Sequence, residues 1–504
     1  TTSASPPLSV GLPSHLPSVW MLSFVVLAGQ LLLLIGGAVF GSLVLLLLLV
    51  KWWLERPLRQ PIGRVRAGGP FKGQAPDDDT YEVCIVGAGP AGSSCAYFSV
   101  KGGVKTLLLE RKTFPRDKYC GDGVCTPAIN ILEEMGVMKT LKENNEVKFA
   151  DAGGLVSPAG LSYIGASVEK LGNAAACAVK RLHLDMRMAF AARDAGASLL
   201  EEQDVIGAEF DDSRGIWTVK TEAGASYKAR LLVCADGAPS RLATKLGYCT
   251  EAPKGISSRA FISGKHNTNF DGVCFYLKGA LPGYCAIFRH PNDELNFCYY
   301  LIPCGKEGMC GDVSEKDLPR LHNYAIKEDP FVSAAIGKQA KIEPMKAAAL
   351  RLARQGVSKS YGPQLLIVGD AAGQCDPLTG EGIHTAMIGG KQAALTIIEM
   401  SREGDYSEES CKVYEDRWLK EFGHDFPISV MGSWLLWKCP MLIDATAAEM
   451  QRQGDKMLAL WAELMTCMKP KTYFLHPSIA LPLGVAVVRR YLSTLIFGEA
   501  KRQL

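Results

Sequence analysis

The sequence predicts an α/β protein in which a parallel sheet covered by helices carries an inserted antiparallel sheet. Three observations predict it: a glycine-rich turn between a buried strand and a helix at 83–100, two later apolar strands that end in polar residues, and alternating segments between 255 and 344. One N-terminal transmembrane helix and a helical C-terminal region, 401–504, complete the expected architecture.

Composition narrows the class of protein. The 504 residues are 48% hydrophobic and 21% charged, which excludes a disordered or low-complexity chain. The net charge of +3, without a basic stripe, argues against nucleic acid as a partner. The 16 cysteines form no C-x-x-C pair, so we expect neither a disulfide framework nor a metal site, and a reducing compartment is the simpler expectation.

Residues 19–50 contain no charged side chain and predict a transmembrane helix, since a span needs about 20 apolar residues. A cleaved signal peptide, with an apolar region of about 7 to 15 residues, is the alternative. The flexible tail expected at 1–18 is uncharged, whereas the linker at 51–79 is basic. The positive-inside rule therefore predicts a single-pass protein whose large domain lies on the cytosolic, stromal or matrix side. The organelle stays open between chloroplast, endoplasmic reticulum and others.

A glycine-rich turn marks the start of the folded region. The apolar run at 83–86 predicts a buried strand, and a small-residue helix is expected at 93–100. Between them, Gly87 permits a tight turn, Gly89 lets the backbone approach a pyrophosphate, and Gly92 allows the helix to pack closely on the strand. This order of elements is typical of a dinucleotide-binding unit.

A second strand, expected at 105–109, ends in a carboxylate at the position that such a unit requires. Glu110 lies 23 residues after Gly87 and is placed to accept hydrogen bonds from a ribose diol. A purely structural glycine turn does not explain this acid. Pro90, Ala91 and Arg111, beside the turn and the acid, are further candidates for cofactor binding.

Two later apolar strands end in Asp236 and Asp370, and parallel strands bring such residues to the edge of a sheet where cofactors lie. Asp370 can bind a ribityl hydroxyl, although a helix cap is its simpler alternative. Gly380, Gly382 and Ile383 begin a helix whose positive end favours an anionic reduced flavin ring. Together these segments favour FAD over NAD.

These motifs resemble the FAD-dependent geranylgeranyl reductase family, within the para-hydroxybenzoate hydroxylase-like flavoproteins, over about residues 81–400. The resemblance also rests on Phe114–Gly123, which contains Cys120-Gly121-Asp122-Gly123, on Arg181–Asp185, and on Gly369–Ile383. It implies a Rossmann-like FAD-binding domain and the saturation of isoprenoid carbon–carbon double bonds. It also implies that Arg181 contacts FAD near its pyrophosphate and that the loop of Cys120 and Gly121 faces the isoalloxazine.

Reduction of an isolated alkene needs a proton donor as well as hydride. Cys120 is one candidate, and Tyr119 or water is the other, with Cys120 then packing against the ring. By the same resemblance, Pro282-Gly283-Tyr284 belongs to a strand of the substrate cavity. The family's usual Gly-Trp continuation reads Cys285-Ala286 here, which could reshape the pocket.

The expected domains follow from these motifs. The FAD-binding domain comprises 80–150, 176–254 and 345–400, and the substrate sheet comprises 151–175 and 255–344. In the C-terminal region, an apolar run at 479–488 has 10 residues, short of the roughly 17 that a span needs. Together with the run at 426–443, it predicts interfacial helices, a re-entrant segment or plain burial.

The sequence therefore predicts a membrane-anchored FAD-dependent reductase acting on a lipophilic prenyl-chain substrate, with membrane lipid and other members of a membrane complex as partners. No second glycine fingerprint is present, so NADPH is expected to bind transiently, or a reduced electron-carrier protein is the donor. Two alternatives stay open. One is a flavin monooxygenase or quinone-linked oxidoreductase on the same fold, and the other is a non-catalytic flavoprotein subunit of a membrane complex.

Overall fold

The computed structural model describes residues 79–166, 176–302, 314–466 and 468–497. All of them belong to the second of two compact units, Arg59–Leu504. The predicted tail at 1–18, the predicted transmembrane helix at 19–50 and the linker up to residue 78 lie outside the described residues.

The first sheet contains the predicted parallel core. Strand β1 (Thr80–Val86) lies between β2 (Thr106–Leu109) and β11 (Ser226–Cys234) and runs parallel to both. Strand β11 also pairs in parallel with β19 (Leu365–Ile367). The remaining strands are β8 (Ser198–Leu200), β9 (Val205–Asp211), β10 (Ile216–Thr221) and β18 (Tyr361–Gly362). The carboxyl ends of β1, β2, β11 and β19 therefore meet at one edge, as the polar residues after them predicted.

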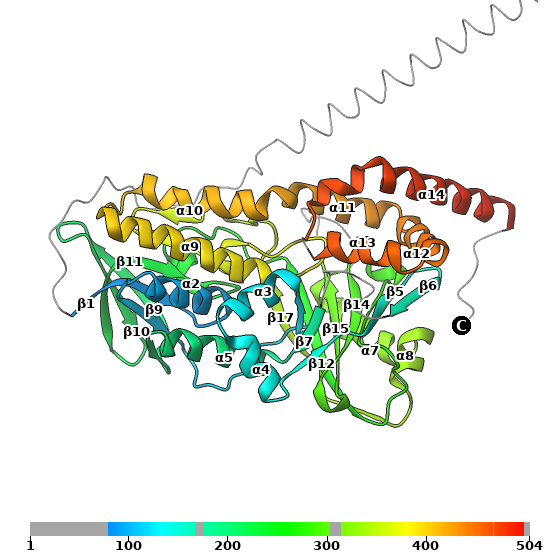
Figure 1. Ribbon diagram of the computed structural model, residues 1–504, viewed down its shortest axis with the longest axis horizontal. Coiled ribbons are helices and arrows are strands. Elements are labelled where there is room, and N and C mark those ends of the chain that lie inside the picture. Colours follow the sequence, from blue (N-terminus) through cyan, green and yellow to red (C-terminus); the bar gives the residue numbers. More distant parts are fainter. Residues whose placement is uncertain (1–78, 167–175, 303–313, 467, 498–504) are drawn as a thin grey trace, which may run out of the picture. The chain divides into compact units, whose positions relative to one another are not determined.

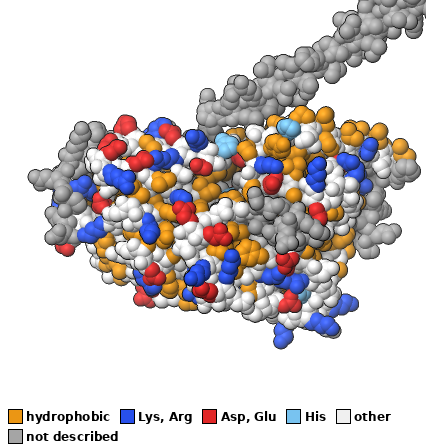
Figure 2. All heavy atoms as spheres, in the orientation of Figure 1, with side chains coloured by type: hydrophobic (Ala, Val, Ile, Leu, Met, Phe, Trp, Pro, Cys, Tyr) orange, Lys and Arg blue, Asp and Glu red, His pale blue; other side chains and the backbone are white. Residues whose placement is uncertain are grey.

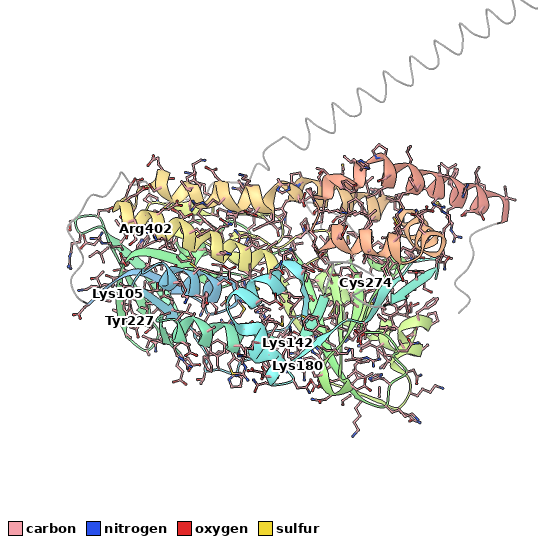
Figure 3. The ribbon with its side chains drawn as sticks, viewed as in Figure 1. Lys105, Lys142, Lys180, Tyr227, Cys274 and Arg402 are labelled. Carbon is pink, nitrogen blue, oxygen red and sulfur yellow. The ribbon has the colours of Figure 1, made fainter. Side chains whose placement is uncertain are left out.

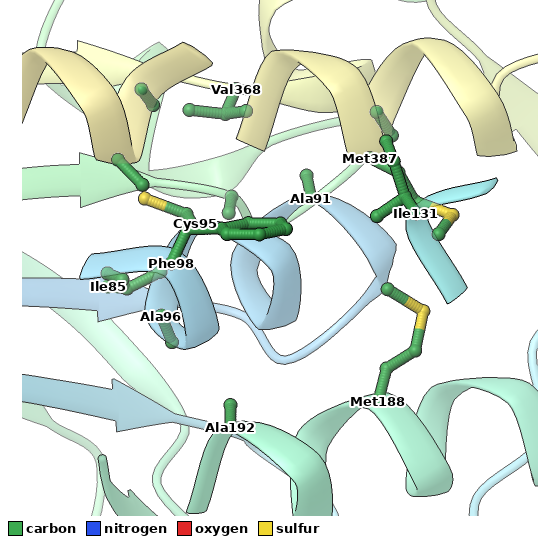
Figure 4. Packing of buried hydrophobic residues seen from close by; sticks show 14 of the residues in the cluster. Ile85, Ala91, Cys95, Ala96, Phe98, Ile131, Met188, Ala192, Val368 and Met387 are labelled. Atoms are coloured by element: carbon green, nitrogen blue, oxygen red, sulfur yellow. The ribbon is translucent and has the colours of Figure 1, made fainter. Parts of the chain in front are cut away.

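Helices α2 (Pro90–Lys101) and α9 (Ile383–Glu403) pack against each other over one face of this sheet (Figures 1 and 4). Small residues permit the contact: a Cβ added to Gly390 would lie 2.3 Å from the carbonyl oxygen of Ala91. The other helices of this part are α3 (Thr126–Glu134), α4 (Val137–Glu143), α5 (Arg181–Asp194), α6 (Arg241–Lys245) and α10 (Glu408–Glu421).

The second sheet is mostly antiparallel, as predicted, with one parallel pair between β5 and β13. Its strands are β5 (Ala152–Val156), β6 (Ser162–Ala166), β12 (Gly255–Gly264), β13 (Gly272–Phe275), β14 (Tyr284–Arg289), β15 (Leu295–Leu301), β16 (Ala340–Ile342) and β17 (Lys346–Leu350). Strand β17 extends this sheet beyond residue 344. Two helices, α7 (Leu318–Lys327) and α8 (Pro330–Ile336), contribute to its core.

A third, small sheet was not predicted. It joins β3 (Gly123–Cys125), β4 (Val147–Phe149) and β7 (Ala176–Val179) in the order β3-β7-β4. Strands this short carry too few residues for alternation of apolar and polar side chains to reveal them.

The C-terminal region is helical, as predicted, and packs on the second sheet. Its main helices are α11 (Phe426–Lys438), α12 (Met441–Gln453), α13 (Asp455–Met465) and α14 (Pro477–Phe497). Leu155 and Tyr276 of the sheet side form one apolar cluster with Ile443 and Leu458 of these helices, and Cys274 packs against that cluster (Figure 3).

One sequence interpretation of this region needs correction. The apolar run at 426–443 forms two helices, α11 and α12, that meet at 97° across Cys439 and Pro440, which leaves the predicted interfacial helices, re-entrant segment and plain burial open. The apolar run at 479–488 is not a short segment, because the helix continues through Arg489 and Arg490. Arginine is a good helix former, so charge ends an apolar run without ending a helix. Within the described residues, Pro477–Ile496 is long and apolar enough to cross a membrane by length and composition.

A buried ion pair ties the C-terminal region to the loop before α9. The Lys471 ammonium lies 2.7 Å from the Asp376 carboxylate, and both side chains are almost completely buried. Burial alone would raise the pKa of Asp376, but Lys471 and the Ser429 hydroxyl hold it below its ordinary value. The carboxylate also accepts hydrogen bonds from the backbone N–H groups of Leu378 and Thr379.

Replacing Lys471 with methionine should therefore destabilise the protein strongly. Lys471→Met leaves the Asp376 charge buried without its cation, which costs about 3–5 kcal/mol. The control is Lys469→Met, which breaks a partly exposed pair with Glu463 and should cost at most about 1 kcal/mol. Thermal unfolding of the purified full chain measures both, and equal losses would contradict the role of Lys471.

Candidate active site

A cavity of about 360 Å³ lies at the carboxyl edge of the first sheet. Its volume falls within the range of about 300–1,000 Å³ common to small-molecule and cofactor sites. The structure brings nearly all of the predicted site residues to its wall: Gly87, Gly89, Pro90, Ala91, Glu110, Arg111, Tyr119, Cys120, Gly121, Arg181, Asp236, Asp370, Gly380, Gly382 and Ile383. Gly92 does not line it. Ser257 and Leu350 of the second sheet also line the cavity, which therefore lies between the two sheets.

The three fingerprint glycines have different surroundings. Gly87 has a φ of +106°, and a Cβ there would lie 2.4 Å from the carbonyl oxygen of Ala235. A Cβ on Gly92 would lie 1.9 Å from the carbonyl oxygen of Gly87. At Gly89 an added Cβ would meet no atom within 4 Å. Gly87 and Gly92 are therefore required by packing, whereas Gly89 keeps the cavity itself free of a side chain.

Two helices begin at the cavity wall. The N-cap residues of α2 and α9 are Gly89 and Gly382, and neither helix start has a side-chain cap. The first backbone N–H groups of each helix therefore remain available to a ligand, and the helix dipole adds partial positive charge. This arrangement fits a phosphate-bearing or otherwise anionic cofactor.

Glu110 belongs to a buried network that sequence reasoning missed. Its carboxylate accepts hydrogen bonds from the backbone N–H of Ala88 at 3.3 Å and from Arg116 at 3.0 Å. Arg116 also donates to Asp185 at 2.6 Å, and Asp185 in turn accepts two hydrogen bonds from Arg181. Arg116 and Asp185 occur in the motifs quoted above, but nothing in their spacing predicts that they meet.

The charges of this network are balanced around Asp185. Its burial alone would raise its pKa, but the guanidinium groups of Arg181 and Arg116 hold the pKa below its ordinary value. Asp185 therefore stays ionised and fixes the two arginines at the cavity. The Arg181 guanidinium is therefore fixed in position by Asp185.

Lys118 and Asp370 form a second charged group at the cavity. Burial lowers the pKa of Lys118 and raises that of Asp370, and each charge partly offsets the shift of the other. Lys118 was not among the predicted site residues, although it lies in the segment Phe114–Gly123. A lysine in a loop carries no distinctive sequence signal.

Asp236 lines the cavity and also stabilises the start of α6. Its carboxylate accepts hydrogen bonds from the Ser240 hydroxyl at 2.5 Å and the Leu242 backbone N–H at 3.0 Å, at the start of α6. Burial raises its pKa. Both carboxylate oxygens are thus engaged in holding the turn, which leaves less capacity for a cofactor than the sequence predicted.

The loop of Cys120 is held by the second sheet. Asn296 of β15 donates hydrogen bonds to the Cys120 carbonyl at 3.0 Å and to the Asp122 carboxylate at 2.8 Å. Asp122 has a positive φ of 63° and also accepts from the Arg181 backbone N–H at 3.3 Å. Burial raises the pKa of the Cys120 thiol, although nearby Arg181 opposes this, so the thiol keeps its proton. Tyr119 is more exposed, with its ring near Arg259 and Lys346.

Glu381, an acid that was not among the predicted site residues, lies in the turn before α9. Burial raises the pKa of Glu381 to about 8 and lowers that of His384 to about 4, so both are mainly neutral at pH 7. Their nearest side-chain atoms, Oε2 and Nδ1, are 3.7 Å apart. Glu381 Oε2 and His384 Nε2 have no hydrogen-bond partner among the described residues. Sequence reasoning used this turn only for its glycines.

The wall residues fit a flavin dinucleotide: a glycine without obstruction, two open helix starts, and arginines fixed beside the Glu110 carboxylate. The comparison with protein families agrees, because residues 80–418 match the model described as FAD binding domain. The chain belongs to this family of FAD-dependent oxidoreductases. FAD is therefore its cofactor, and its relatives include digeranylgeranylglycerophospholipid reductases.

Relatives of this oxidoreductase carry different names. The chain is 46% identical over 440 residues to conditioned medium factor receptor 1 of Dictyostelium discoideum, covering 85% of this chain and 83% of that protein. It is 31% identical over 362 residues to digeranylgeranylglycerophospholipid reductase of Methanocaldococcus jannaschii, covering 70% and 85%. A geranylgeranyl bacteriochlorophyll reductase-like structure from Thermoplasma acidophilum shares the fold, with a TM-score of 0.59, 20% identity, and coverage of 83% and 98%.

Gly89→Val should weaken FAD binding while leaving the fold intact, because the valine side chain would enter the cavity. We expect a loss of affinity of about tenfold or more, or about 1.4 kcal/mol. Flavin absorbance of the purified protein and titration with FAD measure it. Gly207→Val is the control, since its Cβ also meets open space but lies outside this cavity. Gly92→Val should instead lower thermal stability, and a stable Gly92→Val protein would contradict the packing argument.

The pH dependence of stability should reveal Glu381. The pKa of Glu381 is about 8 in the folded protein, above the ordinary value of 4.5. The neutral Glu381 side chain therefore contributes fully to the free energy of unfolding below pH 4.5, and this contribution is lost as the pH rises through 8. His384 acts at lower pH, where its contribution is lost as pH falls from 6.5 through about 4. Between about pH 6.5 and 8, Glu381→Gln should therefore flatten the fall in melting temperature. The exposed Glu399→Gln should not, and identical profiles would refute the raised pKa.

Proposed function

We propose that this oxidoreductase uses reduced FAD to saturate carbon–carbon double bonds of an isoprenoid chain of the geranylgeranyl type. The observation that carries the proposal is the Cys120-Gly121-Asp122-Gly123 loop at the cavity, between Arg181 and the second sheet. This motif is the part of the chain that resembles reductases rather than hydroxylases. The name of the archaeal relative, a digeranylgeranylglycerophospholipid reductase, supports the same substrate class.

The residues of the cavity would divide the work of this reaction. These residues would hold FAD, which in its reduced form would supply hydride to one alkene carbon. The other carbon needs a proton, and the partly buried, protonated Cys120 thiol belongs to the loop that resembles the flavin-facing loop of the family. Asn296 and Asp122 fix that loop, while Arg181 and the two helix starts would bind the anionic part of the cofactor.

The electron donor, the anchor and the partners are part of the proposal. NADPH binding transiently, or a reduced carrier protein, would reduce the flavin, since the sequence has no second glycine fingerprint. The apolar segment 19–50 would anchor the chain by a single pass, with the flavin domain on the cytosolic, stromal or matrix side. An anchored enzyme meets a prenyl lipid by diffusion in two dimensions, because such a chain partitions into the bilayer.

A single anaerobic turnover tests the reaction. The photoreduced full chain is mixed with vesicles that contain a geranylgeranyl lipid, and mass spectrometry follows the lipid. A gain of two hydrogen atoms for each reduced bond supports the proposal. A product that forms only with oxygen and gains oxygen indicates a monooxygenase, and an unchanged lipid with FAD retained indicates a non-catalytic subunit of a membrane complex.

Cys120→Ala should retain FAD and slow alkene reduction roughly 100-fold or more, as expected for loss of a general acid. The control is Cys439→Ala, a partly buried cysteine at the end of α11 that does not line the cavity. Flavin absorbance measures retention, and single-turnover kinetics measure the rate. An unchanged rate would indicate that Tyr119 or water, and not Cys120, donates the proton.

A further inference from the structure

Helix α14 presents a continuous apolar face to solvent. Six large aliphatic side chains on it are between 49% and 70% exposed: Leu481, Val485, Val488, Leu492, Leu495 and Ile496. They recur every three or four residues and so lie along one side of the helix. Figure 2 shows hydrophobic side chains gathered over α14 on this face of the protein. We call these six residues the α14 stripe.

The other side of α14 belongs to the folded domain. Ile479 is 1% exposed, and Leu483 packs against the apolar cluster that contains Ile443 and Met450 of α12. The α14 stripe is therefore exposed although α14 itself packs on the folded domain. One face is used for packing, and the opposite face is equally apolar, which is unusual for a surface helix in water.

The charges around the stripe point to one kind of partner. The sequence of α14 contains no acidic residue but contains Arg489 and Arg490. Arg489 is exposed and follows Val488 directly, at the border of the stripe, where a long side chain reaches lipid head groups. Trp434 and Leu435 of α11 are also exposed, and tryptophan favours membrane–water interfaces. An apolar face on a helix that contains two arginines and no acidic residue matches an anionic lipid surface.

We propose that the α14 stripe docks the folded domain on an anionic lipid bilayer, with α14 lying in the plane of the membrane. A spanning orientation has the required length and composition. It would, however, carry Arg489 and Arg490 through the hydrocarbon and separate α14 from α12. This surface goes beyond the proposed function, because it holds for any lipophilic substrate and adds a second membrane contact to the segment 19–50.

Depth-dependent quenching tests the orientation in the full chain. A fluorescent amino acid is placed singly at Leu481, Val488 or Leu495, and the protein is reconstituted in vesicles of phosphatidylcholine and phosphatidylglycerol. Lipids brominated near the head group or near the chain end serve as quenchers. Ile206, an exposed apolar residue of β9, is the control position. Flavin absorbance verifies that each protein is folded.

Docking in the plane predicts strong and equal quenching by shallow bromines at all three positions, and none at Ile206. A spanning helix would overturn the proposal, because Val488 would lie near the bilayer centre and be quenched most by chain-end bromines, whereas Leu481 and Leu495, about 21 Å apart along a helix, would lie towards opposite surfaces. Absence of quenching at all three positions would also overturn it, because the stripe would then face water or protein.

A charge variant provides an independent check. Val485→Glu, Val488→Glu and Leu492→Glu combined should reduce shallow quenching at Leu481 severalfold, while FAD stays bound. Ile206→Glu, Ile342→Glu and Val413→Glu combined place the same charge on exposed apolar sites elsewhere and should leave the quenching unchanged. Equal effects of the two triple variants would contradict docking through α14. Because neither readout depends on turnover, failure of docking and failure of the proposed reaction remain distinguishable.

Discussion

The close backbone approach at Gly87 is the constraint on which the cofactor cavity depends. No side chain fits between Gly87 and Ala235, or between Gly92 and Gly87, so the ends of β1 and β11 and the start of α2 meet without intervening atoms. The first N–H groups of α2 are thereby brought to the sheet edge where Glu110 ends β2. The arrangement of α2 and Glu110 that we propose for phosphate and ribose binding thus depends on the absence of two Cβ atoms.

The turn at Gly380–Gly382, which lines the cavity, depends on Asp376 in a similar way. This carboxylate receives hydrogen bonds from two backbone N–H groups of its own loop, from Ser429 of α11 and from Lys471. Tyr300 and Tyr284 of the second sheet donate to the carbonyl groups of Pro377 and Thr379 in the same loop. The turn at Gly380–Gly382 is therefore fixed by three parts of the chain, and a buried charge makes the contact specific.

Local patterns in the sequence predicted the strands and helices, but they did not predict which residues far apart in the sequence pair with each other. The strand before Gly87, the acid at Glu110 and the alternating strands after 255 could be predicted because each depends on neighbours a few residues away. Arg116 with Asp185, and Lys471 with Asp376, join residues 69 and 95 positions apart, and no periodicity reveals them. The length of α14 was misjudged for a related reason: apolar character was taken as the limit of the helix, although backbone hydrogen bonds continue through arginine.

The C-terminal region holds the Asp376 loop and docks on lipid, and it uses different side chains for each. Lys471 and Ser429 face inward and hold the Asp376 loop, while the α14 stripe faces outward. Five residues separate Lys471 from the first residue of α14, Pro477, so the loop contact and the lipid contact are close in sequence but use separate surfaces. Removing outward apolar side chains leaves the Asp376 charge paired, and removing Lys471 leaves the stripe unchanged. The region can therefore orient the domain on a membrane without its lipid contacts being part of the cofactor site.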